Sequence, residues 1–371
     1  MSSNRKFPGA SPPVLSTPLG GSERGPSVPA PTTSVAASGQ PPGAGRAPAG
    51  QPVTDQRPPN PAVHAHAPRL VPRALRGGPA LREAWLRAAS LRPGCPLIVV
   101  SSADGGVGRS TVTAALSSVL GLACRRPPLA VDVTGRTWGG LGHRVLRRGG
   151  ASIWDAHTAL ADVPHTDLCT VDSLTQAGVT GWHALLGETQ RTTHRRPLVL
   201  DEAMRVVTAV QPHYPLAVLD APVAELRGVW QLLAEADCPV LVGRASVDGL
   251  QHLMRLLAQL RAVDLGGVVD RAVVVVNATV PSPPREVRAG VHQLAGLVGD
   301  VIRLPWDAHL ARPEPTDPAR TRKPTRLALV ELAAAVLRRC PADPQLSVAL
   351  SAGSVDDRAE DTFGSSDGRT S

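Results

Sequence analysis

The chain has very few lysines and no long apolar run. Lys6 and Lys323 are the only lysines among 39 basic residues, so the net charge of +8 comes from arginine. Because a GC-rich genome also favours arginine, this charge permits binding to DNA or to acidic membranes without arguing strongly for either. No apolar stretch approaches the length of about 18 residues that a membrane span needs, and the N-terminus has no hydrophobic signal-peptide segment. We therefore expect a cytoplasmic protein.

Cysteine is also scarce and scattered. The chain has five cysteines, with no CxxC pair and no spacing typical of a metal site. Cysteines in this pattern are usually reduced thiols in a cytoplasmic protein. We predict that all five are buried: Cys95, Cys124, Cys169, Cys238 and Cys340.

Both ends of the chain lack the apolar periodicity that a folded core requires. Residues 1–68 are dominated by Pro, Gly, Ser and Ala, which predicts a disordered arm. Residues 341–371 are polar and turn acidic, which predicts a disordered tail. Between these ends, we expect an amphipathic helical linker over residues 69–94 and one large α/β domain over residues 95–340.

The linker contains a helical stripe of apolar residues. Leu81, Trp85, Ala88 and Leu91 recur at helical spacing, with arginines off the stripe. Such a helix either packs on the domain that follows it or lies on a membrane surface. The second use would give peripheral contact with the inner face of the cell membrane.

Six short apolar runs, several of them separated by helix-length segments, predict a mainly parallel sheet with helices on both faces. Ligands bind at the carboxyl ends of the strands in such sheets. A final helix is expected from Thr325 to Arg339. The six runs are residues 95–103, 128–133, 215–221, 239–243, 272–277 and 300–304.

A glycine-rich segment follows the first of these runs. Gly105, Gly106 and Gly108 provide backbone freedom and close approach, and the helix that follows adds positive potential at its N-terminus. This combination is typical of a phosphate-binding loop, and Ser110 is placed to hold Mg²⁺ through its hydroxyl. A glycine turn with a purely structural role is the alternative.

Two carboxylates are predicted at the same edge of the sheet as this loop. Asp132 ends the second apolar run, and Asp220 lies at the end of the third. Asp220 has the position of a carboxylate that holds the water bound to magnesium. Either aspartate alone could be a helix cap, so the argument depends on their order after the loop.

Together these motifs resemble the MinD/ParA family of deviant Walker A P-loop ATPases, over residues 96–339. The family loop K-G-G-x-G-K-[ST]-T is similar to residues 104–111, its D-x-D motif to residues 132–134, and its D-x-P-x-G motif to residues 220–224. The resemblance implies a mainly parallel, doubly wound sheet of the SIMIBI-type P-loop class. It also implies ATP and Mg²⁺ as ligands and a nucleotide-dependent homodimer.

The resemblance also implies roles for individual residues. Asp132 and Asp220 would be the catalytic carboxylates, and Ser110 with Asp220 (through water) would hold Mg²⁺. In the family, Asn277 and Pro305 have the positions that border the base. The nucleotide would contact Gly105, Gly106, Val107, Gly108, Arg109, Ser110, Thr111, Asn277 and Pro305.

Within that family, the chain most resembles the EspI-like group of MinD-like proteins encoded with actinobacterial type VII secretion systems. Those proteins also carry a long Pro-rich N-terminal arm. The segments that carry this likeness are "GHRVLRRGGASIWDA", "ASVDGLQHLMRLL" and "LPWDAHLA". The resemblance implies a secretion or division machine as protein partner.

Four departures from the family fall on chemical positions. Asp104 replaces the signature lysine, and Arg109 replaces the loop lysine with a bulkier planar group. Thr134 replaces the second aspartate, which orients water, and Ala224 replaces the switch glycine. Because the glycine loop and the two carboxylates remain, we expect nucleotide binding with slow or absent hydrolysis.

Three functions are therefore open at this point. The first is an ATP-binding regulator with degenerate catalytic motifs that positions a partner such as a type VII secretion system. The second is an active ParA-like ATPase that binds DNA non-specifically in partition or division, with the basic segment 311–326 as its footprint. The third is a pseudo-NTPase scaffold that binds no nucleotide.

Overall fold

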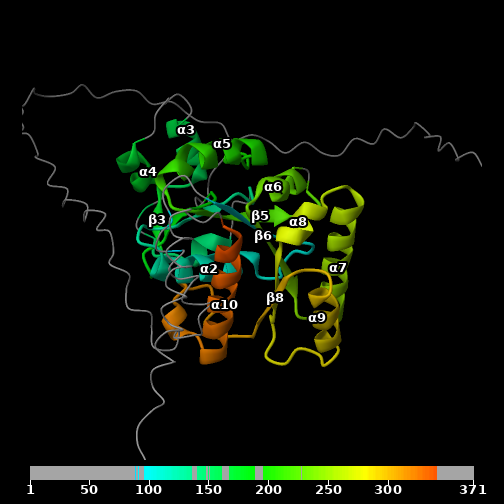
Figure 1. Cartoon of the computed structure of the whole chain (residues 1–371). Coiled ribbons are helices and arrows are strands. Elements are labelled where there is room, and N and C mark those ends of the chain that lie inside the picture. Colours follow the sequence, from blue (N-terminus) through cyan, green and yellow to red (C-terminus); the bar gives the residue numbers. More distant parts are fainter. Residues whose placement is uncertain are drawn as a thin grey trace, which may run out of the picture. The chain divides into compact units, whose positions relative to one another are not determined.

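The computed structural model describes residues 88, 91, 96–135, 140–147, 149, 151–160, 167–188, 195–226 and 228–340. All of them belong to the unit formed by residues 61–371. The predicted arm, the predicted tail and most of the predicted linker lie outside the described residues. Figure 1 shows the sheet with its helices.

The described residues form an eight-stranded sheet with the order β3-β4-β2-β5-β1-β6-β7-β8. All neighbouring strands are parallel except β3 and β4, which form an antiparallel pair at one edge. The strands are β1 (Leu97–Ser102), β2 (Leu129–Asp132), β3 (Gln176–Ala177), β4 (His183–Leu185), β5 (Ala217–Val223), β6 (Cys238–Arg244), β7 (Val273–Asn277) and β8 (Asp300–Leu304).

Helices connect most of these strands. The α-helices are α2 (Arg109–Ala123), α3 (Ile153–Leu160), α4 (Leu168–Leu174), α5 (Leu200–Val210), α6 (Val229–Glu235), α7 (Val247–Ala262), α8 (Gly266–Arg271), α9 (Val287–Ala295) and α10 (Lys323–Arg339). Among the described residues, three short 3₁₀ turns are η2 (Gly140–His143), η3 (Gln211–His213) and η4 (Pro318–Arg320).

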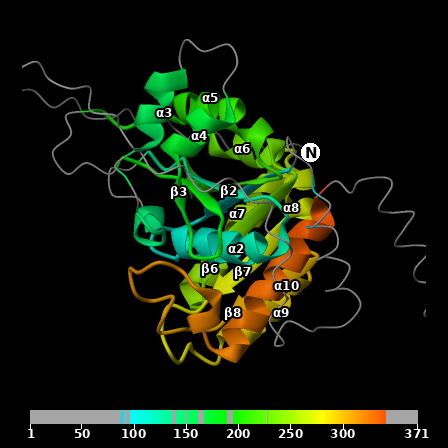
Figure 2. The ribbon, with the colours of Figure 1, turned by 90° about the vertical axis from the view of Figure 1, so that its left-hand side faces the viewer.

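The central strands are covered on both faces, so their residues alternate between two apolar clusters. Ile98 and Val100 of β1 belong to the cluster formed with α2 and α10, whereas Val99 belongs to the cluster on the opposite face. Helices α2 and α10 lie side by side over the first face (Figures 1 and 2). This alternation follows from the period of two along a strand, and it explains why the runs are apolar throughout.

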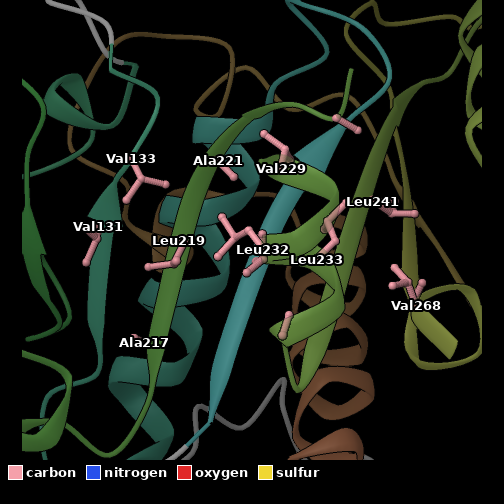
Figure 3. Packing of buried hydrophobic residues seen from close by; sticks show 14 of the residues in the cluster. Val131, Val133, Ala217, Leu219, Ala221, Val229, Leu232, Leu233, Leu241 and Val268 are labelled. Atoms are coloured by element: carbon pink, nitrogen blue, oxygen red, sulfur yellow. The ribbon is translucent and has the colours of Figure 1, made fainter. Parts of the chain in front are cut away.

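Helix α6 contributes to the opposite face. Figure 3 shows Leu232 and Leu233 of α6 among side chains of the strands, including Leu219 of β5 and Leu241 of β6. All four residues are at most 3% exposed. This packing fixes β5 and β6 on either side of β1, and so fixes the carboxyl end of β1, where the glycine loop begins.

The structure confirms the predicted mainly parallel α/β sheet, and each of the six apolar runs contains a strand. The edge strands β3 and β4 were not predicted, because they have two and three residues and carry no clear periodicity. Helix α6 begins at Val229, after Gly228 with φ of 87°.

Two described residues of the linker lie against the domain. Ala88 is helical and 1% exposed, and it belongs to the cluster formed with α2 and α10. Leu91 packs against the same cluster. At these two positions, the predicted stripe faces the domain rather than a membrane surface.

The cysteine prediction is wrong at one position. Cys169 is exposed, because the short helix α4 buries only Val171. Burial raises the pKa of Cys124 and that of Cys238 to about 12, which keeps both thiols protonated. The buried cysteines among the described residues are Cys124, Cys238 and Cys340.

Candidate phosphate-loop site

The glycine loop joins β1 to α2 and requires glycine at two positions. Gly106 has φ of 70° and Gly108 has φ of 91°, in the left-handed region that other residues rarely adopt. A Cβ on Gly108 would also lie 2.4 Å from Nδ2 of Asn277. A Cβ on Gly105 would meet nothing within 4 Å. The loop is therefore built around Gly108.

Asn277, at the end of β7, holds the loop from the opposite side. Its Nδ2 donates a hydrogen bond of 2.8 Å to the carbonyl of Val107, and the residue is 8% exposed. The family resemblance implies that Asn277 borders the base, but it does not imply this structural hydrogen bond to Val107. One donor of the amide already positions the loop.

A cavity of about 220 Å³ opens beside the loop. Gly108 and Thr111 form its loop side, and Asn277 and Pro305 also line it. Four predicted nucleotide contacts are thus brought together. The other predicted contacts, Gly105, Gly106, Val107, Arg109 and Ser110, do not line this cavity. The remaining lining residues are Arg144, Ala278, Thr279, Trp306, Asp307, Leu310 and Ala311.

The two predicted carboxylates are neighbours across the sheet. Asp132 of β2 is in register with Asp220 of β5, and they are 1% and 0% exposed. Oδ1 of Asp132 accepts hydrogen bonds from the backbone N–H and the hydroxyl of Thr134, at 3.0 and 2.6 Å. Thr134, which replaces the family's second aspartate, therefore donates two hydrogen bonds to the first one, Asp132.

Burial dominates the electrostatics of Asp132. It raises the pKa of this carboxyl, and the bonds from Thr134 and the positive charge of Arg109 act in the opposite direction without reversing the shift. The charge of Arg109, the residue in place of the loop lysine, thus acts on this carboxylate. The loop and the end of β2 are therefore linked electrostatically.

The residues present fit Mg²⁺. Both aspartates and the hydroxyl of Ser110 offer oxygen ligands, which Mg²⁺ prefers. Oδ2 of Asp132 is buried without a hydrogen-bond partner in the part of the chain that the structure describes. Across those same residues, no group of three His, Cys, Asp or Glu side chains could hold a metal by itself. Ser110 and ligand oxygens would therefore have to complete the set.

Asp104 is turned toward α7. Nδ1 of His252 donates a hydrogen bond of 2.8 Å to Oδ1 of Asp104, and the side chains are 44% and 33% exposed. The carbonyl of Gly106 accepts a longer bond of 3.4 Å from Nη2 of Arg244. The position that carries the signature lysine in the family thus has an intramolecular partner here.

The switch segment is joined to β1. The backbone N–H of Ala224 donates to the carbonyl of Ser102 at 2.8 Å, and the hydroxyl of Ser101 donates to the carbonyl of Pro222 at 2.6 Å. Ala224 is fully buried. The backbone N–H at the position of the switch glycine is therefore engaged within the protein.

The basic segment 311–326 uses several of its charges internally. Arg320 pairs with Glu314 at 3.4 Å, and Arg322 lies 3.7 Å from Asp307 and over the ring of Trp306. Arg326 donates to the carbonyl of Thr321. These contacts give the arginines structural roles and weaken the argument for a DNA footprint.

The sequence did not indicate three residues of the site. Trp306 follows Pro305 directly and lines the same cavity, so the prediction for Pro305 could have been extended to it. Arg144 and His252 reach the site from segments far away in the chain. Their residue types alone carried no signal, because arginine is abundant and histidine is common on helix surfaces.

Fold and site define a class. The sheet, with a glycine loop between β1 and α2, Asp132 at the end of β2 and Asp220 in register with it on β5, has the fold of the MinD/ParA ATPases. A ParA family ATPase from Chlorobium tepidum superposes with a TM-score of 0.50 at 15% identity, covering 64% of this chain and 98% of that chain. At this identity the comparison shows the fold alone. No family model matches the chain.

The sequence also has curated relatives. It is 28% identical over 221 residues to the ESX-1 secretion-associated protein EspI of Mycobacterium tuberculosis, strains CDC 1551 and H37Rv. The match covers 58% of this chain and 32% of each relative, so it spans about a third of their length. The chain is therefore similar to a ParA family ATPase in fold and to EspI in sequence.

Proposed function

We propose that the chain binds an adenine nucleotide with Mg²⁺ and acts as a nucleotide-responsive regulator with slow or absent ATP hydrolysis. The observation that carries this proposal is the cavity of about 220 Å³, which shares Gly108 and Thr111 with the phosphate loop. Ligand pockets usually measure about 300–1,000 Å³, so this cavity suits one end of a nucleotide. The base would enter the cavity, and the phosphates would lie along the loop.

The roles follow from the donors at each position. Pro305 and Trp306 offer apolar surface to a base in the cavity. The N-terminus of α2 and the glycine loop offer backbone N–H groups to phosphate. Ser110, Asp132 and Asp220 would hold Mg²⁺, which neutralises phosphate charge when it is bound.

Slow turnover is supported by what the catalytic positions do in the fold. Asp104 is bonded to His252, Thr134 to Asp132, and the N–H of Ala224 to Ser102. Stabilising a terminal phosphate in the transition state needs donors aimed at it, and an arginine fork does not fit where a compact ammonium does. Binding needs fewer of these groups.

The test combines binding and turnover. Wild type should bind a fluorescent ATP analogue in Mg²⁺ and hydrolyse ATP barely above background, whereas the double variant Asp104→Lys with Arg109→Lys should gain turnover. Glu331→Lys with Arg303→Lys is the matched control, because it makes the same charge change at exposed positions of α10 and β8. No binding at millimolar nucleotide would overturn the proposal. Fast wild-type turnover would overturn its catalytic part.

One observation favours a second candidate, a pseudo-NTPase scaffold that binds no nucleotide. Asp104 keeps a carboxylate on the loop, and a carboxylate repels phosphate. Binding of ATP·Mg²⁺ to the native state must raise the melting temperature. An unchanged melting temperature at millimolar ATP·Mg²⁺ would favour the scaffold.

We further propose that the regulator serves a type VII secretion complex. The matching relatives are named as ESX-1 secretion-associated proteins, which supports this choice of partner. Throughout the described residues, no helix combines the length and apolar character that a membrane crossing requires. We place the regulator in the cytoplasm, at the inner face of the membrane through its partner, with dimerisation dependent on nucleotide. Mass measurement in solution with and without ATP·Mg²⁺ tests the dimer.

A further inference from the structure

We propose that Arg144 is an anion-binding residue of the cavity, which contacts the phosphate nearest the ribose of a bound nucleotide. The proposal rests on the proposed nucleotide-binding function and adds a residue to it. Arg144 follows the η2 turn and lines the cavity together with Thr111 and Leu310. Sequence motifs did not indicate it.

The guanidinium spans the cavity from helix α2 to the segment after Pro305. Nη2 donates to the hydroxyl of Thr111 at 2.9 Å. Nη1 donates to the carbonyls of Leu310 and Arg312, at 3.0 and 2.6 Å. These bonds fix the plane of the fork beside the loop side of the cavity.

All three acceptors are neutral, so the charge of Arg144 is not balanced by direct contact. In the described parts of the chain, no carboxylate lies within ion-pair distance of its guanidinium. Glu314, the carboxylate that acts on it from farther away, is bonded to His309 at 2.7 Å and paired with Arg320 at 3.4 Å.

Burial sharpens this imbalance. It lowers the pKa of Arg144, although an arginine stays protonated at any pH that the protein meets. A partly buried cation with neutral partners is stabilised when an anion binds beside it. Arginine is well suited to such an anion, because its planar fork bonds two phosphate oxygens at once.

The position of Thr111 identifies which phosphate is contacted. Gly108 and Thr111 are the only described loop and α2 residues that line the cavity, and both lie at its boundary with the phosphate loop. Arg109 does not line the cavity, and its charge acts on Asp132. Arg144 therefore faces the junction of base and phosphate chain, while the terminal phosphate would lie toward Arg109.

The test compares Arg144→Gln with wild type across adenosine, AMP, ADP and ATP, by calorimetry and by ligand-observed NMR for the weakest ligands. Hydrogen bonds to charged groups contribute about 1.5–3 kcal/mol, so affinity for all three nucleotides should fall about 10- to 100-fold. The ratio of ATP to ADP affinity should not change, and adenosine binding should not change. Arg147→Gln is the matched control, because Arg147 is exposed on the same segment and donates to the carbonyl of Gly142, outside the cavity.

Arg144→Lys separates charge from structure. Lysine keeps the cation but not the planar fork, so nucleotide affinity should fall only a few-fold. This should hold even if both variants lower the melting temperature equally. If Arg144→Gln does not fold, Arg144→Lys decides the matter. A loss confined to the three nucleotides, with an unchanged ATP to ADP ratio, supports the proposal. A loss that adenosine shares, or a changed ratio, overturns it.

The other outcomes differ in what they overturn. ADP binding by Arg144→Gln at wild-type affinity would overturn the role of Arg144 alone. An equal loss for adenosine and nucleotides would show a structural role and overturn it as well. If wild type binds no nucleotide, the proposed function fails, and this inference fails with it.

Discussion

The phosphate loop has two sides that use their polar groups differently. On the cavity side, Gly108, Thr111 and Asn277 border an open volume of about 220 Å³, and Arg144 adds a cation whose contacts there are neutral. These groups can contact a ligand without any change in the sheet. The cavity side therefore has the groups that the proposed nucleotide binding would use.

On the catalytic side, the substituted positions are engaged inside the protein. Asp104 is bonded to His252, Thr134 to Asp132, and Ala224 to Ser102. A ligand would have to exchange these bonds for its own, which costs part of the binding free energy. The positions that depart from the family motifs are thus the ones that make internal hydrogen bonds in this fold.

Under the proposed function, nucleotide binding and turnover depend on different sides of one loop. The glycines that shape the loop belong to both sides, so binding alone would require them. Substitutions on the two sides should therefore have separable effects on stability, nucleotide affinity and pH dependence.

The largest effect is expected for Gly108→Ala. Alanine would adopt φ of 91° and place its Cβ 2.4 Å from Nδ2 of Asn277. Backbone strain of this kind costs about 1–3 kcal/mol, and the displaced Asn277 adds to it. We expect a loss of at least about 2 kcal/mol in the free energy of unfolding and no measurable nucleotide binding. Urea denaturation and calorimetry measure the two.

Gly105→Ala is the control for this change. Its Cβ would meet nothing within 4 Å, and its φ is not positive. We expect wild-type stability, which would show that the loss in Gly108→Ala comes from its positive φ and from contact with Asn277. Nucleotide binding by Gly108→Ala at wild-type affinity would contradict this prediction, since binding on the cavity side would then not depend on the shape of the loop.

Much of this architecture could be predicted because its determinants are local. The runs that became β1, β2 and β5 to β8 are continuous and apolar. Their order predicted that Asp132 and Asp220 would be neighbours in the sheet, and the two residues lie in register. The glycines of the loop were recognisable by spacing alone. The two edge strands β3 and β4 were too short to leave a pattern.

The rest of the site depends on contacts between distant segments. Arg144 is 33 residues from Thr111 and 166 from Leu310, and His252 is 148 residues from Asp104. Several arginines stand close together in "GHRVLRR", and nothing in the order of residues shows which one reaches the cavity. Only the packed sheet decides this.

A middle-sized effect is expected from the pH dependence of Asp132. Because burial raises its pKa above the ordinary 3.8, the folded protein holds this proton more tightly than the unfolded chain. Unfolding free energy therefore falls as pH rises from about 3.8 to the raised pKa. Relative to wild type, the unfolding free energy of Asp132→Asn should rise over that range, by about 1.4 kcal/mol for each pH unit that the range spans. Denaturant titrations at a series of pH values measure this.

Asp155→Asn should show the opposite sign. Burial acts to raise the pKa of Asp155, but hydrogen bonds from Ser152 and the Arg195 ion pair outweigh it and lower the pKa. Its contribution is present above the ordinary pKa of 3.8 and lost as pH falls through the lowered one. Parallel curves for wild type and Asp132→Asn would show that the catalytic side is not desolvated as we describe.

The smallest effect is expected for His252→Ala. Its bond to Asp104 joins two side chains that are 44% and 33% exposed, and such pairs contribute about 0–1 kcal/mol. We expect a change of less than about 1 kcal/mol in unfolding free energy. The freed carboxylate should weaken nucleotide binding a few-fold at low salt, because the bond no longer offsets its repulsion of phosphate, and high salt should screen this effect.

His292→Ala is the control for that change, since His292 is exposed on α9. Calorimetric titration with ADP at two salt concentrations measures the difference between the variants. A loss well above about 1 kcal/mol would make His252 part of the fold rather than a partner of the loop. Tighter ADP binding by His252→Ala would place Asp104 among the groups that help binding, and the division between the two sides would have to be redrawn at that residue.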